Sequence, residues 1–564
     1  MAIFRFPGAI ALALLVGVIT FSTARAEDKD LLKRLEALEK QNEELKKNLK
    51  KNVDSYLKEK DDKKKLDDAA KAKTKEDEGF EVGKQLDVKG KWTNSQLWFE
   101  TEDKAFRLHI GGRAQIDAVW VHAPKDMMVA PSMAGIGKFD DAVNYRRARV
   151  AMEGTLWEVF DFNFEWDFSN SFRFVPSGNV LRDADSTNSR TLNNLVGTLA
   201  DRQNVANTPV PTDLWFQWSQ IPFLGNIRVG NQKAWISFEH LTSSRWLDFM
   251  ERSTAFDAFI ENGNNGFQPG ISVFNYYFDQ RMLVAAGVYK SNFRDIFGWN
   301  VGDGEYQFTG RVAGTPVNEN NGRCLVHLGL GYSHYGSDDG GIRWRARPQL
   351  RNGPGFLHNT VAVIQAQAHN LDLINPEIAI NYGPFNLSAE YYYAQARMRP
   401  GDAFQIVGNQ TGSVLPSGGR GTLAYQGGYL TLGYFLTGDY RPYNQKTASW
   451  DRQSVNEPAF VVDGDHGLQF GRGSVEVLAR YSWLDLASQG VNGGTLHSGT
   501  FGINWQFNPN AKLQINYDIG YRDATQYSSV IANGKTVGGL VTGNGNSIRD
   551  GVYQGIGTRL AFDW

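Results

Sequence analysis

The sequence predicts an all-β transmembrane barrel of about 16 antiparallel strands, preceded by an α-helical coiled-coil segment. Three observations support this fold class. Apolar and polar residues alternate with a period of two over most of the chain, the composition is rich in glycine and aromatic residues, and the last strand-like run ends on an aromatic residue. A helical pattern is confined to the first 91 residues.

The composition narrows the class of protein. With 564 residues the chain is long enough for several soluble domains or one large barrel. Its 60 glycines and 13% aromatic residues favour β-structure with aromatic belts over a helical bundle. A formal net charge of -2 argues against a nucleic-acid-binding protein with a basic surface. The single cysteine, Cys324, can form no intramolecular disulfide and matches no metal motif, so we interpret it as a small apolar strand residue.

Residues 1–26 have the features of a secretory signal peptide. Arg5 precedes an apolar run from Ile10 to Ile19, and Ala24-Arg25-Ala26 supplies a small-x-small cleavage site. The alternative is a membrane anchor, but the run is shorter than the roughly 20 residues that cross a bilayer as a helix. We therefore expect an exported chain that begins at Glu27. Because no later stretch is long and apolar enough for a spanning helix, membrane residence requires a barrel.

Residues 27–62 follow a heptad repeat. Apolar side chains recur at alternating steps of three and four, which is the a/d seam of a coiled coil: Leu31, Leu35, Leu38, Leu45, Leu49 and Tyr56. Asn42 and Asn52 occupy two seam positions, where buried asparagine fixes register and strand number at a cost in stability. The alternative is a single solvated, charge-rich helix. Residues 63–91 lack the seam, and their Lys/Asp run predicts a flexible or helical spacer.

Residues 92–564 alternate like strands, with one apolar face and one face that carries ions. The clearest runs are Leu108 to Trp120, Phe160 to Phe168, Val475 to Trp483, Phe501 to Phe507 and Leu513 to Ile519. In the first of these runs, the polar positions include His109, Arg113, Gln115 and Asp117. A soluble β-sandwich also alternates, so the pattern alone leaves both folds open.

Three further features favour a barrel. Apolar faces often end in an aromatic residue, as at a lipid headgroup region. Short turns such as Asn508 to Asn510 alternate with long polar stretches such as Ser169 to Thr212 and Arg522 to Asp550. The chain also closes on Leu560, Phe562 and Trp564, an end that bacterial barrel-insertion machinery recognises. At about 30 residues per strand and loop, this part holds about 16 strands, enough for a water-filled pore.

A row of arginines is a candidate for the pore wall. Arg343, Arg345 and Arg347 stand at i, i+2 and i+4, so a strand would project all three from one face, and Arg351 continues the register. Anion selection needs fixed positive charges spaced along the path. Guanidinium groups stay charged and bind phosphate oxygens in a bidentate fork. The alternative is a solvated basic loop.

Several runs resemble the phosphate-selective porin O and P family. They are YRRARVAMEGTLWEVFDFNFEWDF from Tyr145, FEHLTSSRWLDFMERS from Phe238, LTGDYRPY from Leu436, SVEVLARYSWLDL from Ser474 and INWQFNPNAKLQINY from Ile503. They span essentially the whole barrel portion and leave out the coiled-coil segment. The resemblance implies a trimeric barrel of the bacterial outer membrane that passes anions, with the arginine row as a ladder toward a constriction.

The resemblance also implies a central anion site. By similarity, Arg146 and Arg147 match the paired arginines of that site and Arg252 matches a further one, while Arg149 adds charge to the same wall. Where phosphate-specific members carry a lysine, this chain has His240. Histidine is only partly charged near neutral pH, which predicts a weaker or pH-dependent hold on phosphate.

Two more expectations concern the lumen. The segment from Ala234 to Glu251 resembles the inward-folded constriction loop of the family, although its periodicity alone does not show that it folds inward. Carboxylates also occupy the proposed inner face, where they can pair with lumen arginines and weaken strict anion selectivity: Glu153, Asp161, Glu165 and Asp167.

The sequence therefore predicts an outer-membrane diffusion channel that prefers anions such as phosphate, related oxyanions or chloride. Expected partners are outer-membrane lipid and two further copies of the chain, with no cofactor and no nucleic acid. One alternative is a general porin with little preference. Another is a structural protein whose coiled coil contacts peptidoglycan while the barrel anchors it. We expect no enzyme and no metal site, because G-x-S-x-G, H-E-x-x-H and G-x-x-x-x-G-K-[ST] motifs are absent and the nine histidines are scattered.

Overall fold

The computed structural model describes most of the barrel portion. The described residues are 88–125, 127, 141–174, 180–181, 206–261, 266–290, 306–336, 341–351, 362–367, 370–397, 404–406, 410–411, 422–463, 467–488, 491–523, 530–532, 535–537 and 551–564, with Lys40, Lys47 and Lys58. The chain divides into two units, Met1–Leu86 and Asp87–Trp564. The signal peptide and coiled coil lie outside the described residues apart from the three lysines, as does most of the spacer, and all three remain predictions.

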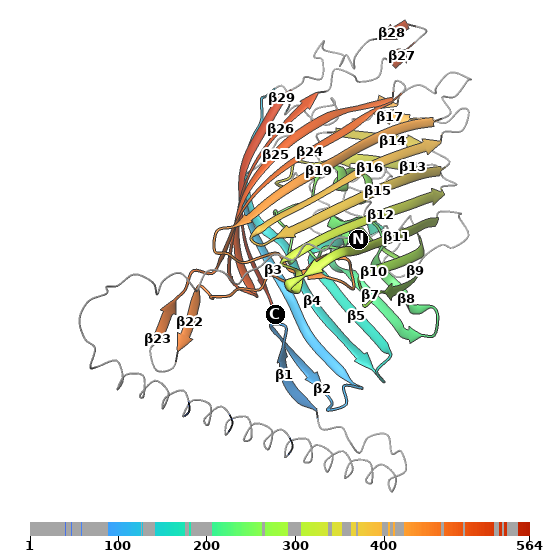
Figure 1. Cartoon of the computed structure of the whole chain (residues 1–564). Coiled ribbons are helices and arrows are strands. Elements are labelled where there is room, and N and C mark those ends of the chain that lie inside the picture. Colours follow the sequence, from blue (N-terminus) through green and yellow to red (C-terminus); the bar gives the residue numbers. More distant parts are fainter. Residues whose placement is uncertain are drawn as a thin grey trace, which may run out of the picture. The chain divides into compact units, whose positions relative to one another are not determined.

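Sixteen antiparallel strands close into a barrel, because the last strand pairs with the first strand of the ring (Figure 1). In ring order they are β3 Arg107–His122, β4 Ala142–Leu156, β5 Phe160–Phe174, β7 Ala206–Ile221, β8 Gly225–Lys233, β9 Phe267–Tyr277, β10 Met282–Lys290, β11 Tyr306–Glu319, β12 Cys324–Gly336, β15 Asn370–Tyr382, β16 Phe385–Arg397, β19 Thr422–Phe435, β24 Ser474–Ser488, β25 Val491–Asn508, β26 Ala511–Asp523 and β29 Gly551–Asp563. The predicted strand number and closure are confirmed, and Cys324 begins a strand as expected.

The remaining elements lie at the ends or inside. The short strands are β1 Lys89–Thr93, β2 Gln96–Glu100, β6 Val180–Leu181, β13 Gly341–Ala346, β14 Ala362–Gln367, β17 Phe404–Ile406, β18 Gln410–Thr411, β20 Tyr443–Asn444, β21 Ser449–Trp450, β22 Phe460–Asp463, β23 Gly467–Phe470, β27 Val530–Ala532 and β28 Lys535–Val537. The described helices are α3 Phe238–Leu241, α4 Thr254–Phe259 and the 3-10 turn η3 Asn320–Gly322. The β1–β2 hairpin pairs with the start of β3, so the β-structure begins slightly before residue 92.

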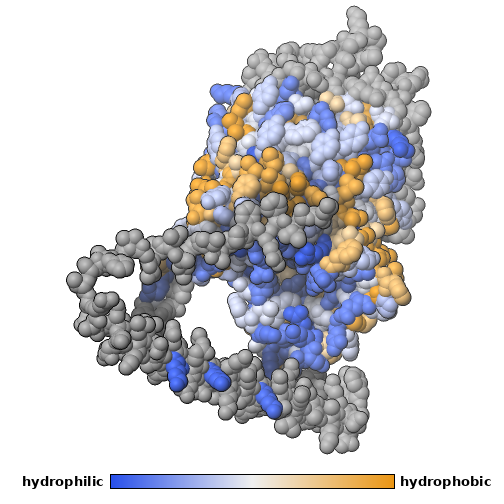
Figure 2. Space-filling view, in the orientation of Figure 1, coloured by the Kyte–Doolittle hydropathy of each residue, from blue (hydrophilic) through white to orange (hydrophobic). Residues whose placement is uncertain are grey.

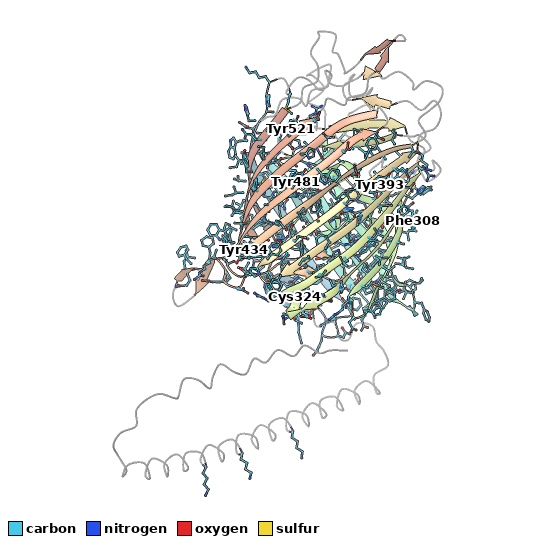
Figure 3. All side chains as sticks on the ribbon, turned by 45° about the horizontal axis from the view of Figure 1, so that its top comes forward. Phe308, Cys324, Tyr393, Tyr434, Tyr481 and Tyr521 are labelled. Carbon is cyan, nitrogen blue, oxygen red and sulfur yellow. The ribbon has the colours of Figure 1, made fainter. Side chains whose placement is uncertain are left out.

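The strand faces follow the predicted alternation. Ile110 and Phe501 are 56% and 57% exposed on the outside, whereas Arg113 and Asp117, two of the predicted polar positions, are 5% and 1% exposed inside. Apolar side chains gather in a band over the barrel surface (Figure 2), and several large aromatic residues stand on the outer wall (Figure 3). No helix among the described residues is long and apolar enough to cross a membrane.

Short turns gather at one end of the barrel, as predicted, and one long connection, residues 436–473 between β19 and β24, lies at that end too. Because the strands are antiparallel, the turns at 157–159, 222–224, 278–281, 383–384 and 509–510 share one end. The C-terminus lies at the same end and completes the closure, since Trp564 and Gly112 exchange two backbone hydrogen bonds of 3.1 and 3.2 Å. A Cβ on Gly112 would come within 2.7 Å of the Trp564 ring, so glycine permits this close approach.

Three segments fold into the barrel. Residues 234–261, between β8 and β9, contact β3 and, across the ring, β16: Gln115 of β3 donates to the Ser244 carbonyl at 3.0 Å, and the Phe238 N–H donates to Glu390 of β16 at 2.8 Å. This confirms the predicted inward fold, and we call this segment the constriction loop. Residues 347–351 also enter, since the Gln349 N–H donates to Asp518 of β26 at 3.1 Å. Residues 436–453, from the short-turn end, are the third segment.

An apolar cluster on the inner wall was not predicted. Buried side chains from α4, β13 and the inner faces of β16, β19, β24 and β25 pack together, including Phe256, Phe259, Trp344, Tyr392, Leu423, Tyr425, Leu484, Leu486 and Leu496. The period-two pattern predicts apolar residues on the lipid face of the strands. Here the inward segments cover part of the wall, so that part is apolar on both faces.

Candidate functional site

A β-bulge turns two consecutive arginines of β4 into the lumen. Consecutive residues of a regular strand point to opposite faces, yet the Arg146 side chain is 11% exposed and Arg147 is 3% exposed, both on the inner side. Gln115 pairs with Arg147 and Ile116 pairs with Tyr145, so Arg146 is the extra residue of the bulge. The bulge therefore places side by side the two arginines that the family resemblance singled out.

Short hydrogen bonds hold the constriction loop in place. Ser237 and Ser253 cap the starts of α3 and α4. Glu390 of β16 accepts the backbone N–H groups of Phe238 and Glu239, each at 2.8 Å. The Glu239 carboxylate in turn accepts the Ser253 hydroxyl at 2.8 Å and its N–H at 3.0 Å. The loop is thus fixed to the wall and to itself, which gives its side chains defined positions.

Glu251 of the constriction loop lies among arginines. Arg146 donates to its two carboxylate oxygens at 2.6 and 3.0 Å, and Arg559 of β29 donates to it at 3.0 Å. Arg559 also forms two bonds of 2.7 Å with Asp117 of β3. Burial alone raises the pKa of the Glu251 carboxyl, but the surrounding guanidinium groups outweigh it and hold this pKa well below its ordinary value.

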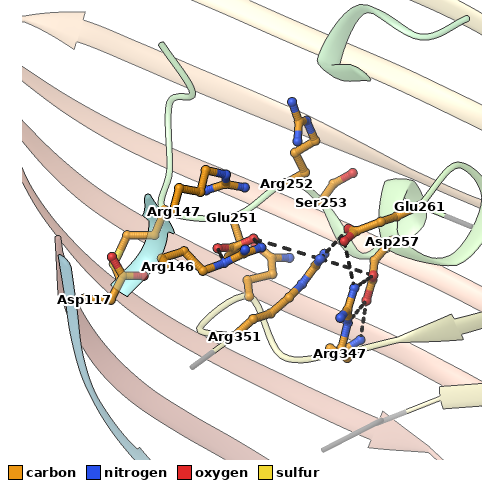
Figure 4. Close-up of polar contacts among 12 residues, drawn as sticks. Asp117, Arg146, Arg147, Glu251, Arg252, Ser253, Asp257, Glu261, Arg347 and Arg351 are labelled. Atoms are coloured by element: carbon orange, nitrogen blue, oxygen red, sulfur yellow. Dashed lines mark hydrogen bonds and ion pairs between the residues drawn. The ribbon is translucent and has the colours of Figure 1, made fainter. Parts of the chain in front are cut away.

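Two more arginines pair with carboxylates of the same loop (Figure 4). Arg347 lies 2.6 Å from Asp257 and 3.0 Å from Glu261, and its backbone N–H donates to Asp257 at 2.7 Å. Arg351 pairs with Glu261 and lies 3.3 Å from Asp257 and 3.9 Å from Glu251. This network ties the constriction loop to β4 and to residues 347–351. We call the arginine clamp the six residues Arg146, Glu251, Asp257, Glu261, Arg347 and Arg351.

The predicted arginine ladder takes a different form. Strand β13 ends at Ala346 and pairs with β14 in a separate four-stranded sheet, not in the barrel wall. Arg347 and Arg351 lie beyond its end, so one strand does not project the whole row from one face, which corrects that expectation. The backbone of Arg343 and Arg345 is in β13, but their side chains lie outside the part of the chain that the structure describes. Their role stays a prediction.

A cavity of about 240 Å³ lies between the constriction loop and the wall formed by β3, β4, β5, β7 and β8. Seven cationic side chains line it: Arg113, Arg147, Arg149, Arg228, Lys233, Arg245 and Arg252. Three carboxylates line it too: Glu153, Glu165 and Asp213. We call this space the basic cavity, because its lining carries four more positive than negative groups.

The cations of the basic cavity fall into two sets. Arg149 is 2.8 Å from both Glu165 and Asp167, and Arg113 also pairs with Glu165, as the predicted pairing of lumen carboxylates requires. Among the described residues, the ion-pair distances of Arg245 are long, 3.9 Å to Glu165 and 3.8 Å to Asp563. The other four form no ion pair with any carboxylate in the described part of the chain: Arg147, Arg228, Lys233 and Arg252.

Neutral oxygens hold these four cations. Arg147 donates to the Gln115 amide oxygen at 2.8 Å, and Lys233 donates to the backbone carbonyl of His240 at 2.6 Å. Arg252 donates to the carbonyls of Glu239 and Thr242, each at 2.8 Å. Carbonyl oxygens orient a cation without neutralising it, so the positive charge remains available to an anion in the cavity.

His240 differs from its predicted role. His240 is 1% exposed, and the centre of its ring lies 5.7 Å from the centre of the Phe256 ring. It is not among the residues that line the basic cavity. Burial first, and then the charges of Lys233 and Arg252, hold the pKa of the His240 imidazole well below its ordinary value. This low pKa disfavours the partly charged imidazole that was expected near neutral pH, and the Lys233 amine lies beside it, 2.6 Å from the His240 carbonyl oxygen.

Four cations of the cavity were not predicted as site residues. Arg113 was identified only as a polar position of its strand, and Arg228, Lys233 and Arg245 were not identified. Lys233 ends β8 directly before the constriction loop, and this position was the available signal. Of the predicted residues, Arg147, Arg149 and Arg252 line the cavity, whereas Arg146, Arg347 and Arg351 lie in the arginine clamp.

The site suits reversible binding of anions. Within the described ranges, no group of three or more His, Cys, Asp or Glu side chains is placed to hold a metal ion. What the geometry offers is an array of fixed donors in a partly enclosed space, which can bind an anion and pass it on.

Two solved porin structures are similar to this chain. An anion-selective porin from Comamonas acidovorans is 12% identical, with a TM-score of 0.41, over 81% of this chain and 100% of that one. The OmpT outer membrane protein of Vibrio cholerae, in its trimer form, is 11% identical, with a TM-score of 0.40, over 82% of this chain and 100% of that one.

Similarity in sequence identifies the family of this chain. A Caulobacter vibrioides protein of uncharacterised function is 25% identical over 442 residues, which are 76% of this chain and 71% of that one. The family model of phosphate-selective porin O and P matches residues 134–537, more than half of the chain. A porin family and a closed 16-stranded barrel together point to a channel in a bacterial outer membrane rather than to an enzyme. The chain belongs to the phosphate-selective porin O and P family.

Proposed function

We propose that this porin is an anion-preferring diffusion channel whose permeant ions include phosphate or related oxyanions. The observation that carries the proposal is the basic cavity, with seven cationic groups against three carboxylates. Fixed charges in a confined, partly dehydrated space act more strongly on a passing ion than the same charges in bulk water. An excess of positive charge there favours anions.

Three residues are the proposed centre of the site. Arg147, Lys233 and Arg252 all line the cavity, and none of them pairs with a carboxylate in the described part of the chain. Guanidinium groups match two oxygens of an oxyanion at once, and the ammonium adds a point charge. Arg149 joins them on the same wall, although Glu165 and Asp167 partly balance it.

The arginine clamp has a supporting part in the proposal. Arg146, Arg347 and Arg351 are held by Glu251, Asp257 and Glu261, so they set the position of the constriction loop more than they attract anions. Arg343 and Arg345, on β13 in the connection between β12 and β15, are proposed to lead anions inward. His240 packs the loop beneath Lys233 and is proposed to contribute no charge.

Planar-bilayer recording tests the function directly. In a KCl gradient, the sign of the reversal potential gives the preferred ion, and phosphate added to chloride solutions should block the chloride current at low concentration. Arg252→Gln should weaken the block by about tenfold, the value of a hydrogen bond to a charged group. Arg472→Gln, whose side chain is 81% exposed outside the lumen, is the matched control. A cation-preferring wild-type pore would contradict the proposal.

A general porin is the second candidate, and one observation favours it. Carboxylates neutralise Arg113, Arg146, Arg149, Arg347 and Arg351, so most lumen arginines carry little free charge. A reversal potential near zero without phosphate block would identify this function. The same recordings thus decide between the two candidates.

We also propose a homotrimer, with the coiled coil of residues 27–62 joining the protomers and reaching toward peptidoglycan. Removal of residues 27–87 tests this part. Loss of the trimer, or weakened peptidoglycan binding and envelope integrity, would support it, whereas a truncated chain that stays trimeric in an intact envelope would contradict it. A channel role predicts unchanged conductance in the truncated protein.

A further inference from the structure

Aromatic rings line the basic cavity together with its cations. Trp215 of β7, Trp235 and Phe267 contribute to the lining, with the aliphatic side chains of Ala151 and Leu241. A site shaped only for an inorganic oxyanion gains from hydrogen-bond donors on all sides, and ring faces offer it nothing because their electron density is negative. The mixture of rings and cations suits a ligand that has both an apolar and an anionic part.

The rings are held in fixed positions next to the charges. The guanidinium carbon of Arg228 lies 3.9 Å from the centre of the Trp215 ring. The Trp215 indole N–H donates to Asp213 at 3.0 Å, and Arg228 donates twice to Gln217, at 2.7 and 3.0 Å. Phe267 lies 5.9 Å from the Lys233 ammonium. This arrangement is ordered before any ligand binds, so binding costs little reorganisation.

The size of the cavity points the same way. Its volume of about 240 Å³ is on the order of twenty times the ~10–15 Å³ that accommodates one water molecule. An inorganic phosphate, with five heavy atoms, leaves most of this space to water. A flat ring attached to the phosphate displaces that water from the aromatic lining, which is favourable.

We infer that the basic cavity binds organic anions that carry a flat apolar group, such as aryl phosphates, more tightly than it binds inorganic phosphate. The anionic group lies against Lys233, Arg147 and Arg252, and the flat group lies against Trp215 and Phe267. This inference rests on the proposed function, because it assigns a substrate class to the same anion site.

The test compares two blockers that share one head group. Chloride currents through the full-length channel in planar bilayers are titrated with inorganic phosphate and, separately, with phenyl phosphate. We expect phenyl phosphate to reach half-block at a concentration about 5- to 10-fold lower, the range that one aromatic contact supplies. The ratio of the two half-blocking concentrations is the readout, because it cancels changes in the charged site.

Two variants and a control locate the effect. Trp215→Leu and Phe267→Leu keep apolar bulk but remove a ring, and each should bring the ratio of the two half-blocking concentrations toward one, whatever its effect on the phosphate titration. Trp218→Leu is the matched control, since Trp218 lies on the same strand and is 53% exposed on the outer face. Its ratio should equal that of the wild type.

The outcomes separate this inference from the proposed function. Equal half-block by the two compounds, or tighter block by inorganic phosphate, overturns the inference and leaves the anion channel standing. A ratio that both ring variants leave unchanged also overturns it. If neither compound blocks the chloride current, the anion site itself is contradicted.

Discussion

The arginine clamp and the basic cavity use the same type of side chain, arginine, in opposite electrostatic states. Arg146 and Arg147 are neighbours in the chain, yet Arg146 pairs with Glu251 at 2.6 Å, whereas Arg147 donates to the neutral amide of Gln115 and pairs with no carboxylate among the described residues. Glu251 and Arg252 are likewise neighbours, and they serve the clamp and the cavity respectively. Figure 4 shows Arg147 and Arg252 on one side of the constriction loop and Arg347 and Arg351 on the other.

This difference separates structural charge from functional charge. In the clamp each guanidinium has a carboxylate, so the network fixes the loop with little net field. In the cavity four cations are held by neutral groups, so their field remains for a mobile anion. A count of lumen arginines therefore overstates the attraction for anions, and the partner of each arginine decides its role.

Glu251→Gln should break the comparison most severely. It leaves Arg146 and Arg559 buried without their shared carboxylate. Removing one partner of a buried ion pair costs about 3–5 kcal/mol. We expect a lower midpoint of thermal unfolding in detergent and a noisier current, because the constriction loop loses its attachment to β4. Glu457→Gln, with a side chain that is 58% exposed, is the control and should match the wild type. A stable variant with a quiet current would show that the clamp is dispensable.

Lys233→Gln and Arg347→Gln should separate the two regions. The first removes a cation without a described carboxylate partner, so the half-blocking phosphate concentration should rise by about tenfold. The second removes a paired cation, so stability should fall by about 3 kcal/mol while phosphate block changes less. Titration of chloride-current block and thermal unfolding are both measured for each variant. Equal phosphate titrations in the two variants would contradict the division into clamp and cavity.

The sequence could predict the barrel because one rule, period-two alternation, acts along every strand. Arg113 and Asp117 face inward and Ile110 faces outward as that rule requires. The rule fails where a second layer covers the wall. Tyr392 and Leu423 face the lumen and are apolar, because α4 and β13 pack on them. Which loop folds inward depends on contacts between distant segments, and alternation carries no information about those.

The candidate site was predictable only in part for similar reasons. Arg147 and Arg252 were assigned by resemblance, and both line the cavity. That Arg146 joins Arg147 on the inner side depends on a bulge opposite Gln115 and Ile116, which the local sequence does not mark. The resemblance pointed to position 240 as the place of the family's lysine. In this chain the amine comes instead from Lys233 at the end of β8, which donates to the His240 carbonyl.

His240 offers a pH-dependent test of smaller size. Its folded pKa lies well below that of the unfolded chain, so below about pH 6.5 the unfolded state binds a proton that the folded state does not. Stability therefore falls as pH falls, by up to about 1.4 kcal/mol per unit from this residue. His240→Gln should lose less stability than the wild type between pH 7 and pH 5 in detergent unfolding. Identical pH profiles would mean that the imidazole charges freely in the folded channel.

Glu153→Gln should give the smallest effect and the finest test of the charge balance in the basic cavity. Glu153 is one of three carboxylates in the lining and takes part in no ion pair with the described cations. Removing it makes the lining more positive by one charge at a partly solvated position, where such changes contribute about 0.2–1 kcal/mol. Half-block by phosphate should therefore occur at a concentration up to about fivefold lower, with unchanged thermal stability. The shift should shrink in concentrated salt, because ions screen a contribution that acts through charge rather than shape. A shift that persists in concentrated salt would instead mean that Glu153 acts by occupying space in the cavity.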